Sequence, residues 1–145
     1  MQAQAMERNS SQQAIAAANE AFYRAFSLRD LPAMDRLWAH VAEVACIHPG
    51  WAPCQGRKAV MESWSGILAN PESPSVRCLQ PRVSLHGPLG LVVCYEAIEG
   101  SYLIATNLFV EEGGGWKLVH HQAGPVSAAP SGPEIAAAPV SERLH

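Results

Sequence analysis

The chain has 145 residues, of which 48% are hydrophobic and 16% are charged, and its formal net charge is -3 at pH 7. This length fits one globular domain built around one hydrophobic core. The negative charge and the lack of a block of Lys and Arg argue against nucleic-acid binding, because neutralising phosphates requires clustered basic side chains.

The sequence also bears on the cellular compartment. No run approaches the roughly 18 apolar residues that span a bilayer, and the N-terminal sequence MQAQAMER lacks the basic and apolar regions of a secretory signal. The four cysteines are dispersed without a C-x-x-C pair: Cys46, Cys54, Cys78 and Cys94. We therefore expect a cytoplasmic protein whose cysteines are small buried hydrophobic residues rather than disulfides or zinc ligands.

The N-terminal third of the chain predicts two helices. Residues 1–11 are polar and are expected to form a flexible arm. From Gln12 the apolar residues recur at helical spacing: Ile15, Ala18, Phe22, Ala25 and Phe26. Asp30 is placed to cap a second, shorter helix whose first turn accepts Pro32. The expected inner face of that helix is formed by Met34, Leu37, Trp38 and Val41.

The next segment places aromatic rings and an imidazole where a strand is followed by a helix. Residues 44–48 predict a short strand that ends at His48. The following PGWAP sequence, which contains Trp51, predicts a turn, because its prolines lack backbone donors. A third helix is expected over Arg57–Ala69, with Trp64 on its apolar face, and Asn70-Pro71 ends it.

From residue 75 onward the pattern indicates strands. Four candidates cover residues 76–86, 89–99, 101–111 and 116–123, separated by glycine-containing turns that are typical of antiparallel hairpins. The short strand at 44–48 must join this sheet, because it has no stable partner alone. Three helices followed by such a meander predict an α+β domain.

Several of the predicted strands are apolar on both faces. Residues 91–94 read LVVC and residues 108–110 read LFV, whereas a sheet with one solvated face would alternate apolar and polar residues. We expect one face to contact the helices and the other to contact a second subunit. Residues 126–145 are rich in Pro, Ala and Ser and are expected to form a flexible tail.

The order of these elements and three short motifs resemble the nuclear transport factor 2-like superfamily, and within it the SnoaL-like branch. The motifs are FYRAFSLRDLPAM at 22–34, GRKAVMESW at 56–64 and GWKLVHHQ at 115–122. The resemblance covers residues 12–125. It implies a cone-shaped α+β fold in which three helices pack on a strongly curved, mostly antiparallel sheet that encloses a pocket. It also implies a homodimer through the outer face of the sheet.

Two relatives in this superfamily suggest which residues line the pocket. Comparison with ketosteroid isomerase places His48 at the position of its general base, and Asn107 and Phe22 at the positions of its oxyanion-hole groups. All three groups differ here, so that enzyme's mechanism is not expected. Comparison with the hub domain of calcium/calmodulin-dependent kinase assigns four residues to the inner face, with His120 outside. The four are Lys117, Val119, His121 and Ala123.

The resemblance thus implies a pocket whose polar groups are His48, Asn107 and His121. Its aromatic walls are expected to be Phe22, Trp38, Trp51, Trp64 and Tyr95. A few polar groups in an aromatic cavity are typical of a site for a small, mostly apolar or ring-bearing molecule. We therefore expect a small-molecule-binding domain.

The alternative function is an enzyme of the isomerase, cyclase or dehydratase type. In it, His48 would act as a general base on a carbonyl-containing ring substrate, because imidazole titrates near neutral pH. Each candidate also has a purely structural explanation: the histidines and Asn107 could satisfy buried hydrogen bonds, and the tryptophans could be core residues.

No metal or cofactor is expected. His48, His121 and Cys46 could be brought together, but no carboxylate is expected beside them, and a metal site needs several converging ligands. The two carboxylates nearest the predicted pocket mouth, Glu62 and Glu96, are expected to face solvent. The sequence also lacks a nucleophile elbow, a phosphate loop and a dinucleotide-binding fingerprint.

Overall fold

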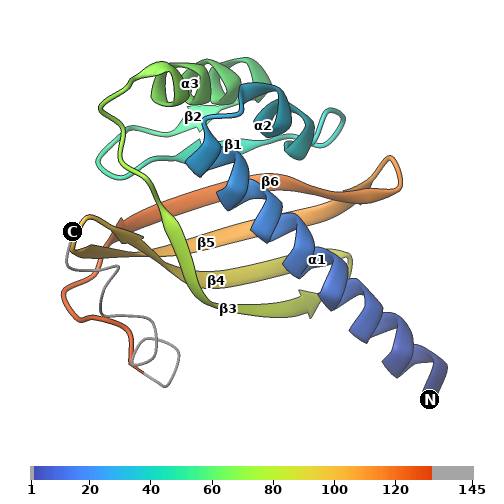
Figure 1. Ribbon diagram of the computed structural model, residues 1–145. Helices are drawn as coiled ribbons and strands as arrows, with labels where there is room; N and C mark the ends of the chain where they lie inside the picture. Colours follow the sequence, from blue (N-terminus) through green and yellow to red (C-terminus); the bar gives the residue numbers. More distant parts are fainter. Residues whose placement is uncertain (1, 132–145) are drawn as a thin grey trace.

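The computed structural model describes residues 2–131. Its helices are α1 (Gln2–Leu28), α2 (Leu31–Leu37) and α3 (Arg57–Ala69). Its strands are β1 (Ala45–Ile47), β2 (Cys54–Gln55), β3 (Arg77–His86), β4 (Leu89–Ile98), β5 (Ser101–Glu112) and β6 (Gly115–Pro125). The predicted α+β class is confirmed: three helices pack on one curved, mostly antiparallel sheet (Figure 1).

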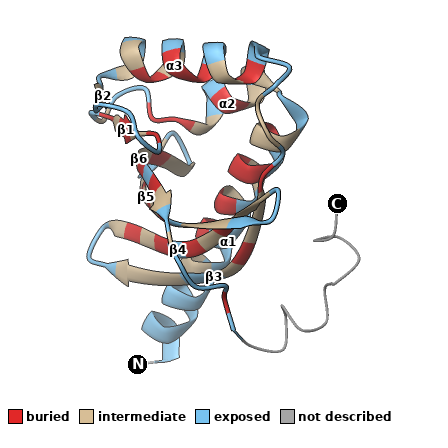
Figure 2. Ribbon diagram, turned by 90° about the vertical axis from the view of Figure 1, so that its left-hand side faces the viewer, coloured by how far each residue is buried: buried red, intermediate tan, exposed pale blue. Residues whose placement is uncertain are grey.

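The sheet has the strand order β2-β1-β6-β5-β4-β3. Strands β3 to β6 form the predicted antiparallel meander. Strand β1 joins it by pairing in parallel with β6, as its short length required, and β2 extends the sheet beyond β1. The two-residue strand β2 was not predicted, because it lies directly after the proline-containing turn. Figure 2 shows the buried residues on the helix faces that meet the sheet.

Helix α1 is longer than the sequence pattern predicted. The expected arm, residues 1–11, is helical from Gln2 onward, although residues 2–10 are exposed. The prediction equated a lack of core residues with a lack of helix. Once Ile15 and Phe22 anchor the second half of the helix in the core, extending it toward the N-terminus needs no new nucleus.

Helix α2 begins as predicted but ends early. The Asp30 carboxylate accepts a hydrogen bond from Ala33 N at 3.1 Å, which confirms the N-cap. The helix stops at Leu37, where Trp38 adopts an extended conformation and pairs with Leu118. Val41 was predicted on the inner helix face and is instead 87% exposed.

A β-bulge in β6 changes which of its residues face the core. Leu108 pairs with His120, but the next residue, Phe109, pairs with Leu118, so Val119 is the extra residue. The bulge reverses the alternation. His121 and Ala123 face inward as predicted, whereas Leu118 is buried in place of Val119. Lys117, also predicted inside, reaches the surface of α2, where its Nζ donates to Arg36 O.

The chain continues past β6 along the sheet. Val126 N donates to Tyr102 O on β5, and Gln80 Nε2 on β3 donates to Ser131 O. The predicted flexible tail, residues 126–145, is described only as far as Ser131, and residues 132–145 lie outside the described residues. None of the helices in residues 2–131 is long and apolar enough to cross a membrane.

Candidate functional site

His48 lies at the end of β1, where the chain turns toward α3. Its side chain is 3% exposed, and its Nε2 is 2.9 Å from Ser63 Oγ on α3. The Ser63 hydroxyl donates its only hydrogen to Val60 O at 2.7 Å, so its oxygen is left to accept from His48. This arrangement places the imidazole proton on Nε2 and leaves Nδ1 as an acceptor.

Aromatic rings surround the His48 imidazole. The centroids of Trp51 and Trp64 each lie 4.8 Å from that of His48, and the His121 ring lies 6.5 Å away. Burial lowers the pKa of His48 to about 4, because the charged imidazolium loses its hydration. His48 is therefore neutral at pH 7.

The other predicted polar residues form a hydrogen-bonded chain across the interior. His121 Nδ1 lies 2.5 Å from Asn107 Oδ1. The Asn107 amide nitrogen lies 2.9 Å from Asn19 Oδ1 and 3.2 Å from the Tyr23 hydroxyl. With the Asn107 oxygen as acceptor, the His121 proton is on Nδ1 and its Nε2 carries a lone pair. Burial, followed by the neighbouring His48, lowers the pKa of His121 to about 3.

Glu96 belongs to the same buried polar cluster, although the sequence prediction placed it in solvent. It is 2% exposed, and its Oε2 accepts from the Tyr23 hydroxyl at 2.7 Å. The same oxygen lies 3.8 Å from His121 Nε2. Burial raises the pKa of Glu96 to about 7, and the Tyr23 hydrogen bond opposes that shift. Because His121 is neutral, this contact joins an imidazole to a carboxyl group that readily holds a proton.

One signal in the sequence could have identified Glu96. Val92, Cys94 and Glu96 alternate along β4, so they point to the same face, and all three are buried. The run of apolar residues on both faces of this strand hid that alternation. Glu62 is exposed as expected and pairs with Lys58.

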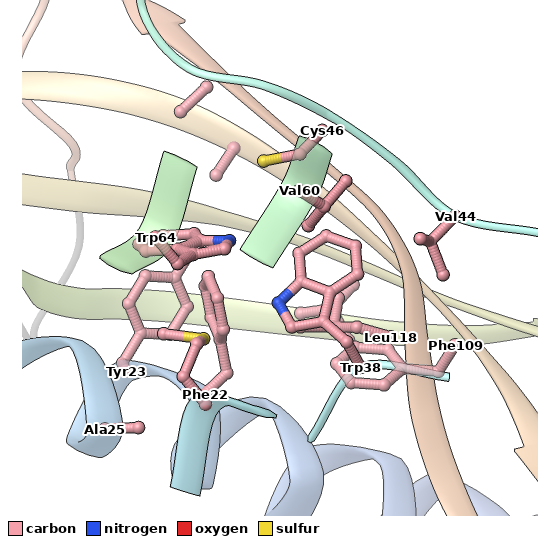
Figure 3. Close-up of a cluster of buried hydrophobic side chains, with 14 of the residues drawn as sticks. Phe22, Tyr23, Ala25, Trp38, Val44, Cys46, Val60, Trp64, Phe109 and Leu118 are labelled. Carbon is pink, nitrogen blue, oxygen red and sulfur yellow. The ribbon is translucent and has the colours of Figure 1, made fainter. Parts of the chain in front are cut away.

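Three of the predicted aromatic wall residues lie in the core. Phe22, Trp38 and Trp64 are 0% exposed, and the Phe22 ring contacts both Trp64 and His121. Among the described residues, Trp38 Nε1 and Trp64 Nε1 are buried without a hydrogen-bond partner. In Figure 3 the nitrogen of each indole lies on the side of its ring that faces the other tryptophan.

The remaining two aromatic predictions have different outcomes. Trp51 is 49% exposed and packs on His48, so it lies at the rim of the site. Tyr95 was predicted to line the interior but points away from it. It lies on the opposite face of β4 from Glu96 and lines a surface hollow with Val93 and Ile104. Tyr95 was misplaced for the same reason as Glu96: β4 is apolar on both faces, so the sequence does not show which of its residues point inward.

Within residues 2–131 no group of three or more His, Cys, Asp and Glu side chains is arranged to hold a metal ion. Cys46 Sγ lies 3.6 Å from His48 Nε2, but burial raises the pKa of this thiol, which keeps it protonated. In the same described range, all four cysteines are free.

The site is thus a buried cluster that combines neutral acceptors, indole donors and a protonatable carboxyl group. The acceptors are His48 Nδ1 and His121 Nε2, and the carboxyl group is that of Glu96. Trp51 is the half-exposed member of the cluster. Such a set could bind a carbonyl group or move a proton next to it.

Comparisons with known proteins agree with this fold. A candidate dehydratase of the nuclear transport factor 2-like family from Streptomyces avermitilis is 33% identical, with a TM-score of 0.75 over 83% of this chain and 99% of that chain. A candidate calcium/calmodulin-dependent protein kinase type II association domain from Thiobacillus denitrificans is 30% identical, with a TM-score of 0.68 over 77% of this chain and 94% of that chain.

A match to a plant protein is partial. The F-box protein SKIP8 of Arabidopsis thaliana is 30% identical over 111 residues, which cover 74% of this chain and 48% of that protein. The match therefore spans about half of that relative's length. Residues 15–127 match the family model of the SnoaL-like domain. The chain belongs to the SnoaL-like domain family of nuclear transport factor 2-like proteins.

Proposed function

We propose that this SnoaL-like domain binds a small, mostly apolar ligand whose carbonyl oxygen enters the cluster around Trp38, Trp64 and His48. The observation that carries the proposal is the pair of unpartnered indole N–H groups. A buried donor without a partner costs about 1–3 kcal/mol, and native proteins hold few of them. A carbonyl oxygen has two lone pairs and could accept from both indoles.

The rim of the cluster supplies a route for such a ligand. Trp51 is half-exposed, and the turn that carries it contains Gly50 at φ +82°, a conformation that glycine adopts without strain. Displacing the Trp51 ring would uncover His48, on which it packs. Ligand entry in this proposal is therefore a movement of the 49–53 turn.

The test compares acetophenone with ethylbenzene, a hydrocarbon of similar size. In thermal unfolding, we expect acetophenone to raise the Tm of the wild type more than ethylbenzene does. Trp64→Phe should abolish that difference, whereas Trp116→Phe, at a partly buried position of β6, should retain it. Because both ligands are measured on each variant, a loss of stability caused by the substitution itself does not affect the comparison.

Two results would contradict binding through the indole donors. One is equal stabilisation of the wild type by ketone and hydrocarbon. The other is an unchanged preference for the ketone in Trp64→Phe. His48→Ala tests the imidazole in the same way, and it should weaken the ketone preference if His48 also contacts the polar end of the ligand.

A second candidate function is proton transfer, in an isomerase-, cyclase- or dehydratase-type reaction. It is supported by His48, a neutral base with a lone pair on Nδ1, and by Glu96, whose raised pKa lets it hold a proton near neutral pH. One of the relatives is named as a candidate dehydratase. In this proposal His48 takes a proton from the carbon next to the carbonyl group.

Deuterium exchange separates the two functions. In D₂O, an enzyme of this kind should exchange the methyl protons of acetophenone faster than buffer does, which proton NMR measures. His48→Gln should return the rate to that of buffer while Trp116→Phe keeps it. If acetophenone binds but its exchange is not accelerated, the protein is a binding domain and His48 does not act as a base.

The proposal also includes a cytoplasmic homodimer that forms through the outer face of the sheet. This face carries apolar side chains, of which Val93 is 36% exposed and Ile104 37% exposed. One relative is named as a candidate association domain. Free cysteines in the described range are compatible with a reducing compartment.

A further inference from the structure

Cys46 and Cys54 lie directly opposite each other in the sheet, at the two ends of the turn that carries His48 and Trp51. They are paired residues of the antiparallel ladder between β1 and β2. Paired residues in such a ladder have Cα atoms about 4.5–5.5 Å apart and side chains on the same face. Disulfide bonds join residues whose Cα atoms are about 4.4–6.8 Å apart. The backbone therefore holds these two cysteines at a spacing that a disulfide bond can span.

The two thiols differ in their access to solvent. Cys46 is fully buried, whereas Cys54 is half-buried and follows the exposed residues 51–53. Burial, followed by the neighbouring Cys54 thiol, raises the pKa of Cys46, and this disfavours the reactive thiolate. Cys54 is therefore the thiol that an oxidant in solution meets first.

His48 gives the buried thiol a proton acceptor. Its Nδ1, which carries the lone pair, lies 4.0 Å from Cys46 Sγ. A thiol must lose its proton before it attacks a neighbouring sulfur. The lone pair on His48 can accept that proton from Cys46, so the buried thiol can react with an oxidised sulfur on Cys54.

From this pairing we propose that Cys46 and Cys54 form a reversible disulfide bond that locks the turn between β1 and β2. With glutathione disulfide as the oxidant, Cys54 attacks one glutathione sulfur, breaks the S–S bond and releases the first glutathione. Cys46 then attacks Cys54 Sγ, and the second glutathione leaves. The proton of each cysteine ends on a released glutathione, so two protein thiols are oxidised while one disulfide is reduced.

The disulfide bond would close a ring that contains His48 and Trp51. It would restrict every opened form of the turn, with or without a ligand. The Trp51 amide donates to His48 O at 2.9 Å, so its hydrogen exchange reports this opening. Slower ligand entry is the one consequence that rests on the proposed function, in which a ligand enters by movement of the 49–53 turn.

The first test is peptide mapping by mass spectrometry after equilibration of the full chain in a glutathione redox buffer. We expect a bond between Cys46 and Cys54 that dithiothreitol reverses. C54S should abolish this bond, whereas C46S should leave Cys54 carrying one glutathione. C78S is the matched control and should retain the bond, because Cys78 is also half-buried and is hydrogen-bonded to another cysteine, Cys94.

Two mapping results would overturn the proposal: no bond between Cys46 and Cys54, or a bond between Cys78 and Cys94 in its place. The Tm of each variant is measured in the reduced form, so that a loss of folding is not mistaken for a loss of the bond.

Hydrogen exchange and ligand kinetics then test the lock. Oxidation of the wild type should slow exchange of the Trp51 amide at least about tenfold, and it should not change this exchange in C54S. In stopped-flow quenching of tryptophan fluorescence, acetophenone should bind the oxidised form about tenfold more slowly than the reduced form.

The outcomes separate this lock from the proposed function. Equal exchange of the Trp51 amide in both redox forms would overturn the lock, and equal binding rates would overturn the control of ligand entry. If acetophenone does not bind even the reduced form, the proposed function fails, while slower Trp51 exchange on oxidation still supports the lock.

Discussion

Glu96, His48 and His121 are three ionisable side chains that the fold places in its interior. Burial disfavours the charged form of each, so it raises the pKa of the carboxyl group and lowers that of each imidazole. The result is a cluster that is largely uncharged at neutral pH. This explains how the core holds these polar groups beside the buried rings of Phe22, Trp38 and Trp64.

These pKa shifts predict how stability depends on pH. The histidines protonate in the unfolded chain below pH 6.5 but resist protonation in the fold until about pH 4 and 3, so stability is lost as pH falls through this range. Glu96 acts oppositely: its pKa rises from 4.5 to about 7 on folding, so stability declines as pH rises between these values. Because two histidines outweigh one carboxyl group, we expect stability in urea unfolding to rise from about pH 4.5 and to level off above pH 6.5, where the remaining contributions of the histidines and of Glu96 cancel.

Glu96→Gln isolates the contribution of the Glu96 carboxyl group to the pH dependence of stability. The amide keeps an acceptor for the Tyr23 hydroxyl but cannot ionise, so the stability that Glu96 removes as pH rises is retained, and the variant should become more stable than the wild type with rising pH. At pH 8 the variant should be more stable than the wild type by up to about 3 kcal/mol, the equivalent of the pKa shift from 4.5 to about 7. A stability difference between Glu96→Gln and the wild type that does not grow between pH 5 and 8 would show that Glu96 is not buried in this way.

At the scale of elements, α2 is a seven-residue helix that depends on its cap. The Asp30 carboxylate accepts from Ala33 N and so satisfies one of the N–H groups that the first turn of a helix leaves free. Asp30→Ala should therefore destabilise the protein by about 1 kcal/mol, measured by chemical unfolding. Asp30→Asn keeps an acceptor of nearly equal capping strength and should cost little. If the two variants lose equal stability, the charge of Asp30 matters rather than its cap.

Helix α1 packs closely on β4 at Gly90. A Cβ added there would lie 2.5 Å from Ile15 Cδ1, and Ile15 is fully buried. Gly90→Ala should cost about 1–3 kcal/mol by overpacking, and Ile15→Val about 0.5–1.5 kcal/mol by lost contacts. Valine lacks the Cδ1 atom that clashes, so the double variant should lose less stability than the sum of the two single variants. Strict additivity in urea unfolding would contradict this packing.

How far the sequence predicts these elements depends on how strongly local residues specify them. Helix α3 and the meander were predicted within a few residues, because helical spacing and glycine turns specify them locally. The bulge at Val119 has no local signal, and it decides that Leu118 rather than Val119 enters the core. Glu96 was misplaced because an outer sheet face that is itself apolar conceals the alternation of β4.

For the candidate site, the sequence and the family resemblance together predicted residues that the fold buries, but not their hydrogen-bond partners. His48, Asn107, His121, Phe22, Trp38 and Trp64 all lie in the interior as predicted. The partners Ser63, Tyr23 and Asn19 come from helix faces whose rotation depends on tertiary packing. Their hydrogen bonds therefore could not be derived from spacing along the chain.

At the scale of the whole molecule, the outer face of the sheet carries apolar side chains, and none of the helices in residues 2–131 covers it (Figure 1). Val93 and Ile104 lie on neighbouring strands of this face, and both are more than a third exposed. Residues 126–131 begin beside Tyr102 on β5 and end beside Gln80 on β3, at one border of the sheet. A second copy of the chain would bury the apolar surface that residues 126–131 leave uncovered.

The proposed dimer predicts a large effect from one charge. In a twofold interface every substituted residue occurs twice, so Ile104→Lys would place two unpaired ammonium groups in an apolar contact. The cost of burying them is several kcal/mol, enough to dissociate the dimer at micromolar concentration. Sedimentation velocity should show a dimeric wild type and a monomeric Ile104→Lys variant of near-native Tm. Val41→Lys makes the same change at a position that is 87% exposed, away from the sheet face, and should remain dimeric. A monomeric wild type, or equal dissociation of both variants, would show that the outer face does not hold two copies together.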